Sequence, residues 1–167
     1  MSGSDPTTIT LLGQMLIDHR ITVPAPPKRV WAFMMDIPAV SRCVPGLGDV
    51  ARIDDQTYSG VMSVRVGPIA VKLDGRVLLA ERDEEAHRAR MDLQAADKRV
   101  NGAVNAKMSM ALAAADGGST DLAIHTDANV MGKLGEFGQA VIRKKADQIL
   151  KEFASNLSAA VASGGGS

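Results

Sequence analysis

Residues 132–161 read GKLGEFGQAVIRKKADQILKEFASNLSAAV, and this stretch decides the fold. Its apolar residues recur at three- and four-residue spacing, which places them along one stripe of an amphipathic helix: Ile142, Ala146, Ile149, Phe153, Leu157 and Val161. At 1.5 Å per residue, a helix of about 30 residues would be about 45 Å long and would cross a small domain. We therefore expect a long C-terminal helix that either covers an internal pocket or only plugs a core.

The chain upstream of this helix alternates between apolar and polar residues, as strands with two different faces do. Strands are expected at residues 15–23, 48–53, 58–66, 69–79, 86–97, 100–114 and 120–129. Two short helices, at 28–35 and 37–43, are expected after the proline-rich break that follows the first strand. This order predicts an α+β fold in which a curved antiparallel sheet of about seven strands surrounds the long C-terminal helix.

Length and composition indicate one domain without affinity for nucleic acid. The 167 residues carry 19 basic and 19 acidic side chains and no basic block. The lone cysteine, Cys43, has no partner for an intramolecular disulfide, which fits a reducing, cytoplasmic compartment. We expect a disordered tail at 1–13, a ligand-binding domain at 14–162 and a flexible linker at 163–167.

The inward strand faces carry small residues, among them Gly75 and Gly102, and methionines rather than bulky aromatic residues. The chain has nine methionines but only one Trp, one Tyr and three Phe. Little bulk is therefore available to fill the concave side of a curved sheet, and flexible thioethers suit an apolar ligand of variable shape. The alternative is a helix that packs closer to the sheet and fills this space.

The apolar residues expected to line such a cavity come from the short helix, the sheet and the long helix. They are Trp31, Met34, Met62, Val64, Leu73, Val77, Met91, Leu93, Val104, Ala106, Met108, Met110, Ile124, Leu134, Phe137, Val141 and Ile142.

Catalytic and metal-binding patterns are scarce in this sequence. The histidines His19, His87 and His125 lie on three separate strands without the spacing of metal ligands. We expect His87 at a strand end, His125 on a solvent face, and His19 at a core or rim position rather than as a ligand or base. Cys43 is expected to be a buried small residue rather than a nucleophile.

Four stretches resemble a known family. They are ITVPAPPKRVW at 21–31, CVPG at 43–46, VRVGPI at 64–69 and GKLGEFG at 132–138. The first is shared widely by the START or birch-pollen-allergen (SRPBCC) superfamily of helix-grip folds. Together, in this order, they resemble the CoxG family of carbon monoxide dehydrogenase subunits, over about residues 15–162.

This resemblance implies a non-catalytic accessory protein of aerobic molybdenum CO dehydrogenase. The protein would act in the cytoplasm at the inner face of the cytoplasmic membrane, to which many members attach through a further C-terminal segment. We expect that segment to be absent or removed here. Together with the expected apolar cavity, the resemblance predicts a carrier of a lipophilic ligand such as a respiratory quinone, menaquinone or ubiquinone, with no covalent cofactor. A small cavity enzyme of the polyketide cyclase or hydrolase type and a purely structural tether are the alternatives.

Overall fold

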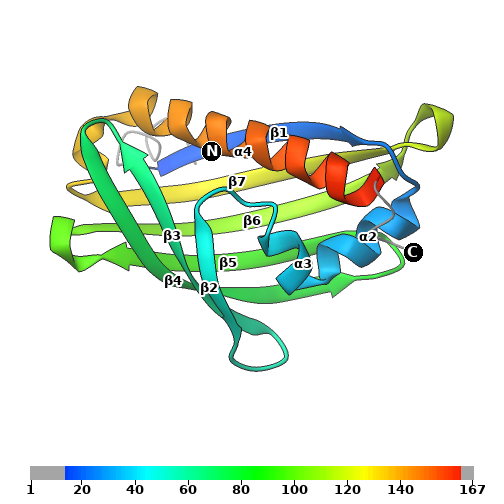
Figure 1. Ribbon diagram of the computed structural model, residues 1–167, viewed down its shortest axis with the longest axis horizontal. Coiled ribbons are helices and arrows are strands. Elements are labelled where there is room, and N and C mark those ends of the chain that lie inside the picture. Colours follow the sequence, from blue (N-terminus) through cyan, green and yellow to red (C-terminus); the bar gives the residue numbers. More distant parts are fainter. Residues whose placement is uncertain (1–13, 163–167) are drawn as a thin grey trace, which may run out of the picture.

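The computed structural model describes residues 14–162, in which seven strands form one antiparallel sheet in the order β1-β7-β6-β5-β4-β3-β2. The sheet curves around the long helix α4 (Gln139–Ala160), which runs along its concave side beside β1 (Figure 1). The curved sheet around a C-terminal helix, predicted from the sequence, is therefore confirmed. The expected tails at 1–13 and 163–167 lie outside the described residues. The strands are β1 (Gln14–Val23), β2 (Leu47–Arg52), β3 (Thr57–Val66), β4 (Ile69–Asp83), β5 (Arg88–Asp97), β6 (Gly102–Ala114) and β7 (Thr120–Gly132).

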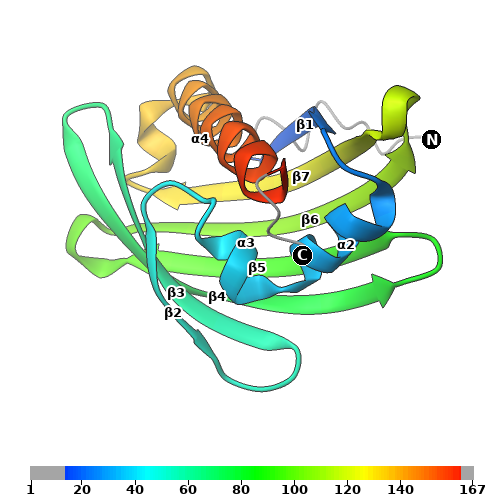
Figure 2. The ribbon, with the colours of Figure 1, turned by 45° about the vertical axis from the view of Figure 1, so that its right-hand side comes forward.

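Two short helices, α2 (Pro27–Met35) and α3 (Ile37–Ser41), follow β1 as predicted. Pro27 occupies the first turn of α2, where its missing N–H costs no hydrogen bond. The Asp36 carboxylate accepts a hydrogen bond from the Ala39 N–H at 3.3 Å and so caps the start of α3. Both helices close the end of the sheet where α4 finishes (Figure 2).

The long helix begins seven residues later than the sequence pattern indicated, at Gln139 instead of residue 132. β7 extends to Gly132, and residues 135–137 form a single 3-10 turn. Gly132 and Gly138 have φ values of +68° and +87°, which a helix cannot contain. The Lys133 N–H also bonds the Asn101 carbonyl at 2.7 Å, which holds this segment to the β5–β6 connection. A helical periodicity cannot reveal such a contact between distant residues.

The buried apolar residues form two separate clusters. The first core cluster lies between α2, the second half of α4 and the sheet; it includes Val23, Val30, Trp31, Leu122, Phe153, Leu157 and Val161. The second core cluster, at the opposite end of the sheet, consists of Val66, Val71 and Leu134, with partly buried neighbours such as Phe137 and Ile142. The two ends of the concave side are therefore packed independently of each other.

A buried carboxylate, Asp97, ties the end of β5 to its neighbours. It accepts hydrogen bonds from the Lys72 N–H at 2.8 Å, the Arg99 N–H at 3.0 Å and the Arg99 Nη2 at 3.0 Å. The side-chain bond from Arg99, and next the bond from Lys72, lower the pKa of Asp97 from 3.8 to about 2. Because the ionised form is favoured in the folded state, its stabilisation is present above about pH 4 and is lost as pH falls towards about pH 2.

Replacing Asp97 with asparagine is therefore expected to lower the free energy of unfolding at neutral pH and to have much less effect near pH 2.5. Urea unfolding of both proteins over this pH range measures the difference. Glu84→Gln, in the exposed turn between β4 and β5, is the control and should change little at any pH. If Asp97→Asn lowered the free energy of unfolding by the same amount at every pH, the role assigned to this carboxylate would be wrong.

Candidate functional site

Strand pairing brings the expected lining residues of the sheet onto its concave face. Ala106 of β6 is paired with Leu93 of β5 and with Ala128 of β7, and Leu93 is paired with Val77 of β4. The remaining sheet residues follow the same alternation: Met62, Val64, Leu73, Met91, Val104, Met108, Met110 and Ile124. One face thus carries every strand residue that the sequence assigned to the cavity.

The end of this face beneath α2 is closed by packed side chains. Trp31 and Met34 are buried in the first core cluster together with Met110 and Ile124, while Met91 and Met108 pack partly buried against it. The indole of Trp31 also stacks on the imidazole of His87, with the ring centroids 5.3 Å apart. Trp31 and Met34 therefore form a wall at this end.

The opposite end is closed by the segment between β7 and α4. Leu134 is buried above Gly102, where an added Cβ would come within 2.7 Å of the leucine Cγ. The Phe137 ring lies against Gly67 in the turn between β3 and β4. Val64, Leu73, Val104 and Ile142 pack around this second core cluster. Gly102 is thus small because a leucine covers it, and not because it leaves room for a ligand.

Some apolar side chains of the inner face belong to neither cluster, and three of them are called the middle row here. Val77 and Leu93 are paired with each other, Met62 is paired with Leu73 at the border of the second core cluster, and all three are only half-buried. Burial of apolar side chains is favourable, so an inward face that stays half-buried is a natural place for an apolar ligand. This middle row is the candidate binding site.

Two expectations about individual lining residues need correction. Val141 is 41% exposed, because it lies on the face of α4 that carries Gln148 and Glu152 and not on the stripe of Ile142 and Phe153. Gly75 is small for a backbone reason, since an added Cβ would lie 2.4 Å from the Gln94 carbonyl oxygen. The sequence pattern did not place Met15 of β1 on this face, where strand pairing puts it.

Polar groups are sparse on this face. His19 of β1 lies at the border with α4, where its Nε2 is 3.4 Å from Asp147 Oδ1; its buried Nδ1 has no hydrogen-bond partner within residues 14–162. His125 is on the outer face, as expected, with its Nδ1 2.6 Å from Asp18 Oδ1. Cys43 is buried, and desolvation raises the pKa of its thiol despite the opposing charge of Arg42, so it is unsuited to nucleophilic attack.

Neither a metal site nor a membrane-spanning helix is found among the described residues. Within 14–162, no group of three or more His, Cys, Asp or Glu side chains is arranged to hold a metal ion. Among the helices of this part of the chain, none is both long and apolar enough to traverse a lipid bilayer. Two surface hollows lie away from the middle row, one between α2, α3 and the end of α4, and one on the outer face of the sheet.

Comparison with known families and structures supports this fold. The model of the CoxG family, carbon monoxide dehydrogenase subunits, matches residues 20–162. A conserved protein from Geobacillus kaustophilus is 19% identical with a TM-score of 0.81, and the match covers 89% of this chain and 96% of that chain. A comparison with curated proteins found no match.

Two enzymes of known structure share the fold at lower similarity. Zhui aromatase/cyclase from Streptomyces sp. R1128 is 15% identical with a TM-score of 0.62, covering 89% of this chain and 96% of that chain. Norcoclaurine synthase from Thalictrum flavum, solved with dopamine and hydroxybenzaldehyde, is 16% identical with a TM-score of 0.64, covering 90% and 88%. At these identities the likeness shows the helix-grip fold alone.

Proposed function

Because this chain belongs to the CoxG family of carbon monoxide dehydrogenase subunits, we propose that it is a non-catalytic accessory protein that carries a respiratory quinone to CO dehydrogenase. The quinone, menaquinone or ubiquinone, would lie between the concave face of the sheet and α4. The protein would work in the cytoplasm at the inner face of the membrane, from which it takes its ligand. CO dehydrogenase would carry out the redox chemistry.

The observation that carries this proposal is the half-buried middle row of Met62, Val77 and Leu93 on a face whose two ends are packed. A face of this kind removes a long apolar molecule from water without requiring a specific polar contact. Methionine side chains adapt to irregular shapes, which suits an isoprenoid tail with many conformations. The ligand class that fits is therefore lipophilic and extended.

A cavity enzyme is the less favoured candidate. Acid–base catalysis requires several polar side chains that converge on one substrate atom. On this face Tyr58 of β3 is paired with Val77, His19 of β1 is paired with Ile124 at the other side of the sheet, and the Asp97 carboxylate is occupied by Lys72 and Arg99. The separation of Tyr58 and His19 across the sheet supports carriage of a ligand over chemistry on it.

Quinone capture can be tested directly with the full chain. The protein is incubated with liposomes that contain menaquinone, separated from them, extracted with organic solvent and analysed by mass spectrometry. We expect about one menaquinone per chain. Liposomes without protein, carried through the same separation, give the background. A folded protein whose extract holds no more menaquinone than this background would rule out the carrier.

The enzyme partner is tested in a second step. Loaded protein is mixed with CO dehydrogenase and CO, and reduction of the quinone to quinol is followed by its absorbance. Oxidation of CO with water releases two electrons and two protons, the number that one quinone takes up to become a quinol. Reduction no faster than with dispersed menaquinone alone would contradict delivery to this enzyme while leaving quinone binding intact.

A further inference from the structure

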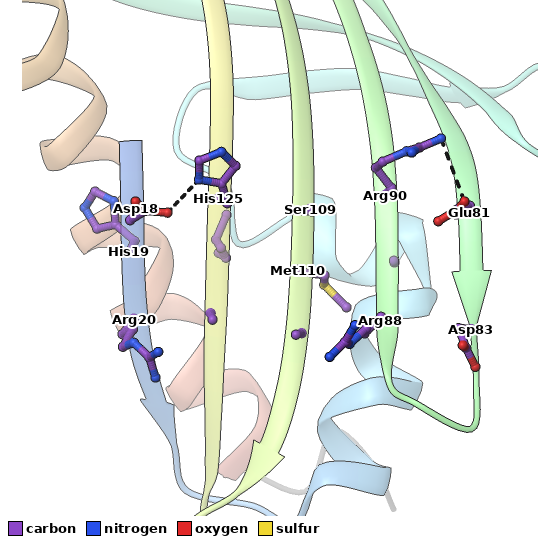
Figure 3. A pocket seen from close by; sticks show the side chains of 14 residues that line it. Asp18, His19, Arg20, Glu81, Asp83, Arg88, Arg90, Ser109, Met110 and His125 are labelled. Atoms are coloured by element: carbon purple, nitrogen blue, oxygen red, sulfur yellow. Dashed lines mark hydrogen bonds and ion pairs between the residues drawn. The ribbon is translucent and has the colours of Figure 1, made fainter. Parts of the chain in front are cut away.

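The outer face of the sheet, opposite α4, carries a hollow framed by charged side chains (Figure 3). Strand pairing defines a row across it: Arg20 of β1, Ala123 of β7, Ala111 of β6 and Arg88 of β5. The two alanines form a low floor, because long side chains stand on both sides of them. Beneath this floor lie the buried side chains of Met110 and Ile124.

The charged groups beside this row are already paired. His125 Nδ1 lies 2.6 Å from Asp18 Oδ1, and Arg90 Nη2 lies 3.9 Å from Glu81 Oε2. Both pairs belong to the next row of the sheet, which runs parallel to the row of the alanines. These side chains are therefore engaged with each other rather than with a ligand above the alanine floor.

Arg20 and Arg88, in contrast, have no ion-pair partner within residues 14–162. Asp83 is the direct cross-strand neighbour of Arg88, but its carboxylate accepts the Ala86 N–H at 3.1 Å in the turn instead. Figure 3 shows Arg88 extending from β5 towards β6, away from Asp83, and Arg20 standing over β1 at the other side of the two strands that carry the alanines. The two arginines thus border the same floor on opposite sides.

We propose that Arg20 and Arg88 form a binding site for a phosphate group on the outer face of the sheet. Three strand spacings separate the two residues, about 14 Å between Cα atoms, so that two extended arginine side chains can reach one small anion between them. Each guanidinium presents a planar fork of donors that binds two oxygens at once. A tetrahedral phosphate offers oxygens to both forks, whereas a carboxylate has only enough for one.

The surroundings favour such an anion. The apolar residues beneath the floor lower the local dielectric constant, which strengthens the attraction between the arginines and a phosphate. Ser109, exposed in the neighbouring row, adds a hydroxyl donor at the edge of the hollow. Phosphate binding here does not depend on quinone carriage, because the hollow lies on the other face of the sheet.

The site is tested by nuclear magnetic resonance on the full chain. Inorganic phosphate is titrated at constant ionic strength, and the amide and methyl signals of Ala111 and Ala123 are followed. We expect saturable shifts centred on these residues, and an affinity weaker by about tenfold in Arg20→Gln and in Arg88→Gln, because each loses a charge-assisted pair of bonds. Arg76→Gln, an exposed arginine on the same face outside the hollow, is the matched control and should bind as the unaltered protein does.

A second measurement separates two sources of phosphate, a free anion and a lipid headgroup. Vesicles of phosphatidylglycerol or of phosphatidylcholine are sedimented with the unaltered protein and with the double variant Arg20→Gln/Arg88→Gln. Retention on phosphatidylglycerol that the double variant loses identifies the lipid as the source. Saturable shifts with inorganic phosphate and no retention identify a free anion. The site is wrong if neither binds, or if Arg76→Gln weakens binding as much as Arg20→Gln does.

Discussion

Replacing Ala106 with tryptophan is expected to abolish menaquinone capture while the protein remains folded. Ala106 stands on the concave face of β6, paired with Leu93 of the middle row and with Ala128. An indole at this position would project into the space assigned to the ligand and fill it. The measurement is the liposome transfer described above, in which we expect the extracted menaquinone to fall to background.

The control places the same indole on the other side of the same strand. Ala113 of β6 is exposed on the outer face, so Ala113→Trp should leave menaquinone capture unchanged. Circular dichroism and thermal unfolding verify that both variants are folded. Capture by a folded Ala106→Trp protein at the level of Ala113→Trp would show that the ligand lies elsewhere.

Replacing Leu157 with alanine is expected to cost about 2–5 kcal/mol of the free energy of unfolding. Leu157 is fully buried in the first core cluster, together with Phe153 and Val161 of the same helix end. Because a domain of this kind has a total stability of about 5–15 kcal/mol, the loss should shift the midpoint of urea unfolding clearly.

Val141→Ala is the matched control on the same helix. Its side chain is exposed, so the change should alter the free energy of unfolding by less than about 0.5 kcal/mol. Equal losses in Leu157→Ala and Val141→Ala would contradict the packing of α4 against the sheet.

Periodicity in the sequence was sufficient to predict the strands, the two short helices and the residues that share the concave face. These features are local, because side chains alternate along each strand whatever its partners are. The predicted start of α4 was wrong for a nonlocal reason, since the Lys133 N–H bonds Asn101 some thirty residues earlier in the chain. Val141 was assigned to the cavity although it lies outside the apolar stripe of the helix, and it is exposed.

The small residues were only partly understood from the sequence. Gly75 and Gly102 were expected to leave room for a ligand, yet close approach of Gln94 and Leu134 accounts for them. The phosphate site could not be read from the sequence at all. Arg20 and Arg88 border the same hollow only because β1 pairs with β7, which lies about a hundred residues later in the chain, and no local pattern indicates that register.

The uneven packing of α4 gives the molecule a preferred direction of opening. The buried side chains of α4 are Phe153 and Leu157, both in its second half, whereas Val141 is exposed and Ile142 and Ile149 are half-buried. Gly138, at φ +87°, lies directly before the first turn of α4, and the backbone dihedrals of a glycine can change there at little cost. The amino-terminal half of the helix therefore buries less apolar surface than the carboxyl-terminal half, and polar contacts such as the 3.1 Å bond from Arg143 Nη1 to the Leu16 carbonyl hold it to β1. A long ligand would enter beneath the Gly138 end. The first half of α4 would then move outward while Phe153 and Leu157 stay packed against the sheet.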